Sequence, residues 1–101
     1  MTNENTLENS PVLAECYDEL CDILTRVNDK ALMKEIFECL CSPAERKDFA
    51  ERWLLVKEID NGVPQRKIAK DYCMSLCKIT RGSKELKKED SAFRKMLDMV
   101  K

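Results

Sequence analysis

Basic residues able to contact the phosphates of a nucleic acid are concentrated in one short segment, residues 64–88. This segment has a net charge of +6, whereas residues 1–63 carry −7 and the whole chain −1. Its basic residues are Arg66, Lys67, Lys70, Lys78, Arg81, Lys84, Lys87 and Lys88. Modules that bind a phosphate backbone gather positive charge in this way. The charge pattern therefore indicates that residues 64–88 meet an anionic partner.

Residues 65–88 also have the spacing of a helix-turn-helix. Counted from Gln65, Ile68 falls at position four, which points into the core, and Ala69 at position five, where a small residue lets the second helix cross. Ser75 stands where the second helix needs an N-cap, and Ile79 stands where it needs an apolar anchor. The spacing and the charge together favour a DNA-binding module over a plain helical hairpin.

Cys73 occupies the turn of this motif, where glycine is usual. The turn requires a positive φ, which costs a residue other than glycine something on the order of 1 kcal/mol. Because a folded domain tolerates a cost of this size, we expect a left-handed cysteine at this position.

The second helix of the motif is expected to enter the major groove of double-stranded DNA, where each base pair offers a distinct pattern of donors and acceptors. Leu76 and Cys77 can contact thymine methyl groups, while Lys78 and Thr80 can hydrogen-bond base edges or phosphates. Further contacts are expected from the start of the first helix and the end of the second, mainly with the DNA backbone. They involve Gln65, Arg66, Lys67, Lys87 and Lys88.

Six cysteines and the absence of histidine bear on catalysis and metal binding. The cysteines are Cys16, Cys21, Cys39, Cys41, Cys73 and Cys77, with no Cys-x-x-Cys pair. A zinc site would therefore need an unusual all-thiolate ligand set, so we expect no metal. Most of these cysteines fall on apolar stripes, where a free thiol packs as a small hydrophobic group. Without histidine we find no convincing acid–base or nucleophilic site, so we do not expect an enzyme.

Helices joined by short loops are expected to position these residues, because the chain has only two glycines and three prolines. Apolar residues recur every three or four positions over residues 11–27, 32–40 and 49–59, and a short final helix is expected over residues 93–100. Residues 1–9 are polar and unpatterned, which predicts a flexible arm. We therefore predict a single all-α domain over residues 10–101.

Helix boundaries can be predicted from capping residues. Ser10-Pro11 is typical of a helix start, and Asp29 can cap the second helix. Residues 42–45, Ser-Pro-Ala-Glu, have the pattern of a capping box for the third helix. Asn61-Gly62 is expected to end that helix, with the glycine in the left-handed conformation.

The location of the protein is suggested by what the sequence lacks. No stretch of apolar residues is long enough to span a membrane. The first residues have neither the basic nor the apolar part of a signal peptide. We therefore expect a cytoplasmic protein.

Ile79-Thr80-Arg81-Gly82-Ser83, followed by Leu86-Lys87, resembles the hallmark of the tryptophan repressor family. Residues 42–46 and Arg52 match the same family, so that the resemblance covers about residues 36–90. The resemblance implies an intertwined six-helix homodimer that binds palindromic operator DNA when L-tryptophan is bound as corepressor. It also implies control of genes for tryptophan biosynthesis or uptake.

The same resemblance implies a ligand site on the second helix of the helix-turn-helix, which we call the reading helix because it is expected to contact the bases. The indole would lie between Arg52 and Arg81, since arginine both stacks on aromatic rings and pairs with carboxylates. Arg81 would take the ligand carboxylate with help from the Ser42 hydroxyl, and Gly82 would leave room for the ligand. The ligand ammonium would meet the backbone carbonyls of the partner subunit's Cys39 and the partner subunit's Cys41.

Glu85 departs from the family, which has a small residue there, often Ser or Ala, beside the ligand ammonium. A carboxylate at this position could strengthen ammonium binding. It could instead pair with Arg81 one turn earlier and compete with the ligand carboxylate, because residues four apart are neighbours on a helix. In addition, residues 62–65 form a connection one residue shorter than in the family, with Val63 where a capping Ser or Thr is expected, and Lys84 replaces a frequent Asn.

Two alternatives to a tryptophan-dependent repressor remain open. One is a regulator of the same fold that binds DNA without tryptophan or with a different amine-bearing ligand, and Glu85 motivates it. The other is a helical protein-interaction module with no DNA role, which the local charge of +6 disfavours.

Overall fold

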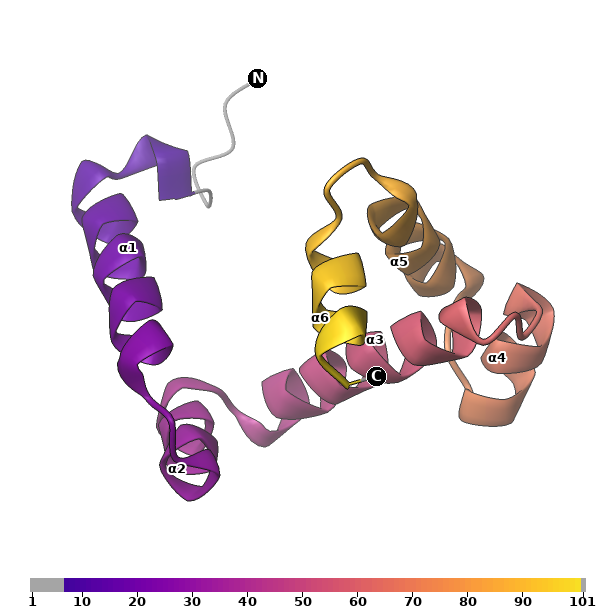
Figure 1. The fold of residues 1–101 in the computed structure, drawn as a ribbon, viewed down its shortest axis with the longest axis horizontal. Helices are drawn as coiled ribbons and strands as arrows, with labels where there is room; N and C mark the ends of the chain where they lie inside the picture. The colour runs from indigo at the N-terminus through magenta and orange to yellow at the C-terminus, as the bar shows by residue number, and fades with distance from the viewer. Residues whose placement is uncertain (1–6, 101) are drawn as a thin grey trace. The chain divides into compact units, whose positions relative to one another are not determined.

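Residues 7–100, the part of the chain that this structure, a computed structural model, describes, fold into helices joined by short loops (Figure 1). A short 3-10 helix, η1, precedes six α-helices, and this range contains no strand. The elements are η1 (Leu7–Asn9), α1 (Pro11–Arg26), α2 (Lys30–Leu40), α3 (Pro43–Asp60), α4 (Gln65–Tyr72), α5 (Leu76–Lys87) and α6 (Ala92–Val100). The predicted all-α, six-helix fold is confirmed. Residues 1–6 of the predicted arm lie outside the described residues.

Three of the helices begin at side-chain caps that the sequence predicts. The oxygens of Ser10, Asp29 and Ser75 accept backbone N–H bonds from Leu13, Ala31 and Lys78 at 3.3, 3.0 and 3.2 Å. Each such cap satisfies a donor that the first turn of a helix leaves unpaired, and its loss costs about 1 kcal/mol. The starts of α1, α2 and α5 are therefore fixed by local chemistry.

The end of α3 is fixed by Gly62, which has a φ of 83° as predicted. The Gly62 N–H bonds to the carbonyl of Ile59 and the Val63 N–H to that of Glu58, each at 3.0 Å. These two bonds form the Schellman motif, which satisfies the last carbonyls of a helix. The chain then turns through Pro64, which precedes α4 without a side-chain cap.

Contacts divide the chain into two compact units, one ending at Ser42 and the other beginning at Pro43. In the first unit, α1 and α2 contain no buried residue. Their large apolar side chains are exposed instead, at Val12, Leu13, Tyr17, Ile23, Leu32 and Leu40. Such stripes usually mark a surface that another apolar surface covers. A single domain over residues 10–101 stays a prediction.

The second unit has a hydrophobic core around α5, which packs against α3, α4 and α6 (Figure 1). The core consists of Leu55, Val56, Ile68, Met74, Ile79, Leu86 and Leu97. Ile68 and Ile79 are fully buried, as the helix-turn-helix spacing predicts. The turn between α4 and α5 is thereby held by apolar residues from both of its helices.

Gly82 lets α5 approach α3 closely. It is buried, and a Cβ at this position would overlap the Cδ1 atom of Leu55. The sequence interpretation assigned this glycine to a ligand, whereas the nearest neighbour in the structure is a core leucine. The absence of a side chain at Gly82 therefore first of all allows the short distance between α3 and α5.

Cys73 ends α4 in the left-handed conformation, with φ 54° and ψ 41°, which confirms the prediction for the turn. The following Met74 N–H bonds to the Ala69 carbonyl at 3.1 Å and closes the turn. None of the six cysteines is buried: Cys41 is half-buried and the others are exposed. Within each unit, therefore, the cysteines do not pack as buried core residues, unlike the prediction from the sequence.

Candidate nucleic-acid interface and ligand pocket

The starts of α4 and α5 bring together residues expected to contact DNA. The Thr80 hydroxyl donates to the Gln65 side-chain oxygen at 3.4 Å, which links the two helices across their exposed face. Leu76 is half exposed and Cys77 is also exposed, while Gln65 is half-buried. The helix-turn-helix thus presents apolar and hydroxyl groups at the start of its second helix, where contact with base edges is expected.

Basic side chains border this face. Arg66, Lys67 and Lys87 are exposed, which suits contacts with phosphates. Lys67 forms an ion pair with Asp71 one turn later, at 2.9 Å. The hydrogen bond and the charge of Asp71 raise the pKa of Lys67 above its ordinary value. Lys67 therefore carries its positive charge at neutral pH.

Lys78 has surroundings that the sequence did not predict. Its ammonium lies 3.6 Å from an Asp48 oxygen and 3.7 Å from a Glu51 oxygen, both on α3. Its side chain is 30% exposed, compared with 62% for Lys67 and 63% for Lys88 in their own ion pairs. In this arrangement Lys78 faces α3, and two carboxylates compete with any phosphate for its charge.

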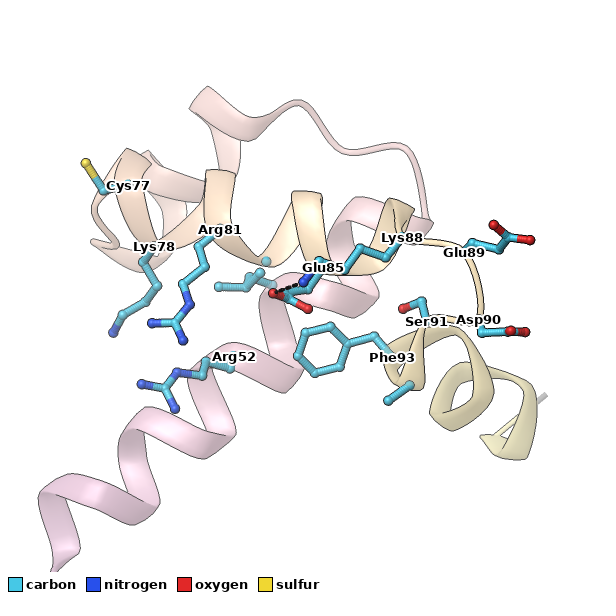
Figure 2. Close-up of a pocket in the computed structure, with 13 residues that line it drawn as sticks. Arg52, Cys77, Lys78, Arg81, Glu85, Lys88, Glu89, Asp90, Ser91 and Phe93 are labelled. Atoms are coloured by element: carbon cyan, nitrogen blue, oxygen red, sulfur yellow. Dashed lines mark hydrogen bonds and ion pairs between the residues drawn. The ribbon is translucent and has the colours of Figure 1, made fainter. Parts of the chain in front are cut away.

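A cavity of about 750 Å³ opens between α3, α5 and the start of α6. Figure 2 shows the side chains of Arg52 and Arg81 approaching it from α3 and α5, with Phe93 of α6 farther along. Leu55 and Gly82 line it from the core side. Its size is that of a small-molecule site, and its lining combines cationic and acidic side chains with apolar surface, which suits a charged aromatic ligand.

Glu85 and Arg81, two charged residues that line the cavity, differ in their ion pairs. Glu85 pairs with Lys88 at 2.8 Å, and not with Arg81, its other neighbour on α5 (Figure 2). Arg81 has no ion-pair partner within residues 7–100. The Arg52 guanidinium lies 5.9 Å from the centre of the Phe49 ring. Arg81 therefore remains available to an anionic ligand.

Four residues predicted for the ligand site line this one cavity: Arg52, Arg81, Gly82 and Glu85. Ser42, Cys39 and Cys41 belong to the other unit, and their roles stay predictions. Cys77 and Lys78, predicted to contact DNA, line the cavity as well. Both predicted sites therefore include residues of the same helix, α5.

Several lining residues were not predicted from the sequence. They are Leu55, Phe93 and the residues of the connection after α5, Lys88, Glu89, Asp90, Ser91 and Ala92. The connection turns at Asp90, which has a φ of 55°, and Ser91 accepts from the Arg94 N–H at the start of α6. In the sequence, Ser91 could have indicated where this connection ends and the last helix begins, because serine is a typical N-cap.

Metal binding and membrane spanning were also considered for the part of the chain that the structure describes. It contains no cluster of three or more residues able to hold a metal ion. None of its helices is both long and apolar enough to cross a membrane.

Two helices joined by a left-handed turn, with a capped second helix and exposed basic residues, define a helix-turn-helix protein. The Trp repressor protein family matches residues 15–101. The chain therefore belongs to the Trp repressor family and is a DNA-binding repressor. The family is one of transcriptional repressors and is not an enzyme class.

Similar proteins come from chlamydiae. The Trp operon repressor homologs of Chlamydia trachomatis serovars L2 and D are each 33% identical over 76 residues, covering 74% of this chain and 81% of theirs. That of Chlamydia caviae is 28% identical over 82 residues, covering 80% of this chain and 81% of its own. No solved structure gives a significant match.

Proposed function

We propose that the protein is a homodimeric repressor that binds palindromic operator DNA with L-tryptophan as corepressor. Its targets are then genes for tryptophan biosynthesis or uptake. The observation that carries the proposal is the approach of Arg52 and Arg81, from two different helices, to one cavity beside the reading helix.

The cavity has the chemistry that L-tryptophan requires. Two guanidinium groups can stack on an indole and pair with a carboxylate. Arg81 has no competing ion pair among residues 7–100, so its guanidinium can pair with the ligand carboxylate. Leu55 and Phe93 supply apolar surface for the ring. The residues present therefore fit an aromatic amino acid.

The position of the cavity supports a link between ligand and DNA. Arg81, Gly82 and Glu85 all belong to α5, the second helix of the helix-turn-helix. A ligand held between α3 and α5 fixes the angle of α5 relative to the rest of its unit. Because base contacts require that angle to match the major groove, bound ligand favours operator binding.

The homodimer is supported by the first unit. Its two helices expose apolar stripes and bury no residue. A second copy of the same stripe is a self-complementary cover, as in an isologous interface. A dimer also presents two reading helices, which matches the two halves of a palindrome.

Operator binding with and without L-tryptophan tests the proposal. We expect duplex DNA affinity, measured by fluorescence anisotropy, to rise with L-tryptophan and to fall steeply with salt. Arg81→Ala should abolish the tryptophan response, because it removes both stacking and carboxylate pairing. Lys84→Ala is the control: it removes a charge from the same helix outside the cavity and should preserve the response. An unchanged response of Arg81→Ala would contradict the pocket assignment.

A second candidate is a regulator of the same fold that responds to another amine-bearing ligand or to none. The carboxylate of Glu85 in the cavity favours it. Calorimetric titration with L-tryptophan separates the two: absence of heat at millimolar ligand, with DNA binding retained, would establish this second candidate.

A further inference from the structure

The start of α6 forms one wall of the cavity. Ser91, Ala92 and Phe93 line it, and Figure 2 shows the Phe93 ring reaching from α6 toward α3 and α5. Phe93 is half-buried and packs against the core of the second unit. Within α6, whose nine residues the structure describes, only Leu97 is buried. Because a helix this short is not stable alone, the position of the wall depends on how α6 is attached to the rest of its unit.

An ion pair attaches α6 to the end of α3. The Arg94 guanidinium donates to an Asp60 carboxylate oxygen at 2.8 Å, although the two residues are 34 positions apart in the chain. The Asp60 side chain is 16% exposed and that of Arg94 44%. Since solvent and salt screen a partly buried pair less than an exposed one, this contact is stronger than a pair between two exposed side chains.

The surroundings of Asp60 favour a nearby cation. Asp60 is the last residue of α3, where the helix dipole places a partial negative charge. A carboxylate at that end is unfavourable unless a positive group lies close to it. Arg94 supplies this group from a helix start that is itself fixed, because its N–H donates to the hydroxyl of buried Ser91 at 3.3 Å. The pair therefore joins two helix ends, each constrained by its own chemistry.

The ion pair lies next to the ring that lines the cavity. Arg94 directly follows Phe93 in the chain, so both belong to the first turn of α6. Neighbouring residues on a helix project about 100° apart, which lets Phe93 face the cavity while Arg94 reaches the end of α3. Neither Asp60 nor Arg94 lines the cavity. Any effect of the pair on a ligand is therefore exerted through the position of α6.

We propose that Asp60 and Arg94 are positioning residues, whose ion pair holds the start of α6 against the end of α3 and keeps Phe93 in place as a wall of the ligand cavity. This inference rests on the function proposed above, in which the cavity binds a ligand. Without the pair, the wall is in place in a smaller fraction of the molecules, and the apparent ligand affinity falls in proportion to that fraction. The helix-turn-helix contains neither residue, so DNA binding without ligand is unaffected.

Exchange of the two charges tests this inference. Dissociation constants for L-tryptophan are measured by calorimetry, well below the unfolding midpoint of each variant. We expect Asp60→Asn and Arg94→Met each to weaken binding about threefold to fivefold, and the double variant to be no weaker than either. Asp60→Arg combined with Arg94→Asp reverses the pair and should recover most of the affinity, since the reversed charges also suit the two helix ends. Lys95→Met is the matched control, because it removes the neighbouring exposed cation of α6.

Hydrogen exchange gives a second readout that needs no ligand. In Arg94→Met, the amides of residues 95–98 should exchange about threefold to fivefold faster than in the wild type, because α6 opens more often. The amides of α4 and α5 should keep their wild-type rates. A contribution to global stability alone would instead change exchange in all helices of the second unit and would leave the ligand affinity of the folded protein unchanged.

The outcomes separate this inference from the proposed function. If exchange in α6 is faster but L-tryptophan binds Arg94→Met as tightly as the wild type, the pair does not position the ligand wall, although the cavity still binds the corepressor. If Lys95→Met weakens binding equally, general positive charge is responsible and the inference fails. A loss that the charge exchange does not recover would also contradict it. If the wild type does not bind L-tryptophan, the proposed corepressor and this inference are both wrong.

Discussion

Cys73 carries backbone strain inside the helix-turn-helix. Its φ of 54° lies in the region that glycine adopts without steric cost and that a cysteine adopts against the contact of its Cβ with the backbone. The conformation persists because buried Ile68 and Met74 flank the turn and fix the path of the chain. The strain is thus offset by core burial on both sides of the turn.

Cys73→Gly should stabilise the protein. Relief of the left-handed strain is expected to raise the free energy of unfolding by about 1 kcal/mol. Urea denaturation followed by circular dichroism measures this change. Cys73→Ala is the control, because alanine keeps the Cβ and should give no gain. Equal stabilisation by both substitutions would mean that loss of the thiol, and not the backbone conformation, is responsible.

Single residues were predictable where local geometry constrains them. Ile68, Ile79, Cys73 and Ser75 have the burial or conformation that the motif requires. Leu55 was not predicted, because it stands in a continuous apolar run in which helical periodicity does not distinguish one face from another.

At the scale of elements, α3 acts on the reading helix through charge as well as packing. Asp48 and Glu51 lie within 3.7 Å of the Lys78 ammonium. No sequence pattern indicates this contact, since it depends on how α3 and α5 approach one another across Gly82. Lys78 was predicted to reach DNA, and in the structure two carboxylates hold it toward α3.

Asp48→Asn combined with Glu51→Gln should therefore strengthen DNA binding by the ligand-free protein. Release of Lys78 adds one phosphate contact, and we expect affinity to rise about threefold at low salt. The measurement is fluorescence anisotropy with operator-length duplex DNA.

Lys78→Met separates release of this lysine from a general loss of negative charge. In that background the two substitutions on α3 should change affinity very little. A gain that persists in Lys78→Met would show that long-range repulsion of DNA, and not the ion pairs, limits binding.

At the scale of the whole molecule, the two units differ in how they bury apolar surface. The second unit has its own core, whereas α1 and α2 leave Leu13 56% and Tyr17 54% exposed. The helices themselves were predictable from their apolar periodicity. Whether another surface covers their apolar faces was not predictable, because periodicity gives the apolar face of a helix and not its partner.

For a homodimer formed through these faces, we expect charged substitutions on α1 to weaken the association of the two copies. Sedimentation velocity should give twice the chain mass for the wild type, and Leu13→Glu with Tyr17→Glu should shift the protein toward the monomer because the buried charges are unpaired. Glu15→Gln with Glu19→Gln, elsewhere on α1, is the control and should stay dimeric. A wild-type monomer at tens of micromolar would contradict the proposed dimer.

The double use of α5 has an evolutionary consequence. Arg81 and Glu85 line the cavity, whereas Leu76 and Thr80, on the same helix, do not. Under the proposed function, a substitution at Glu85 changes the ligand to which the repressor responds while the residues proposed to read the operator stay intact. A lineage can therefore acquire a new signal without rewriting the binding sites in its genome.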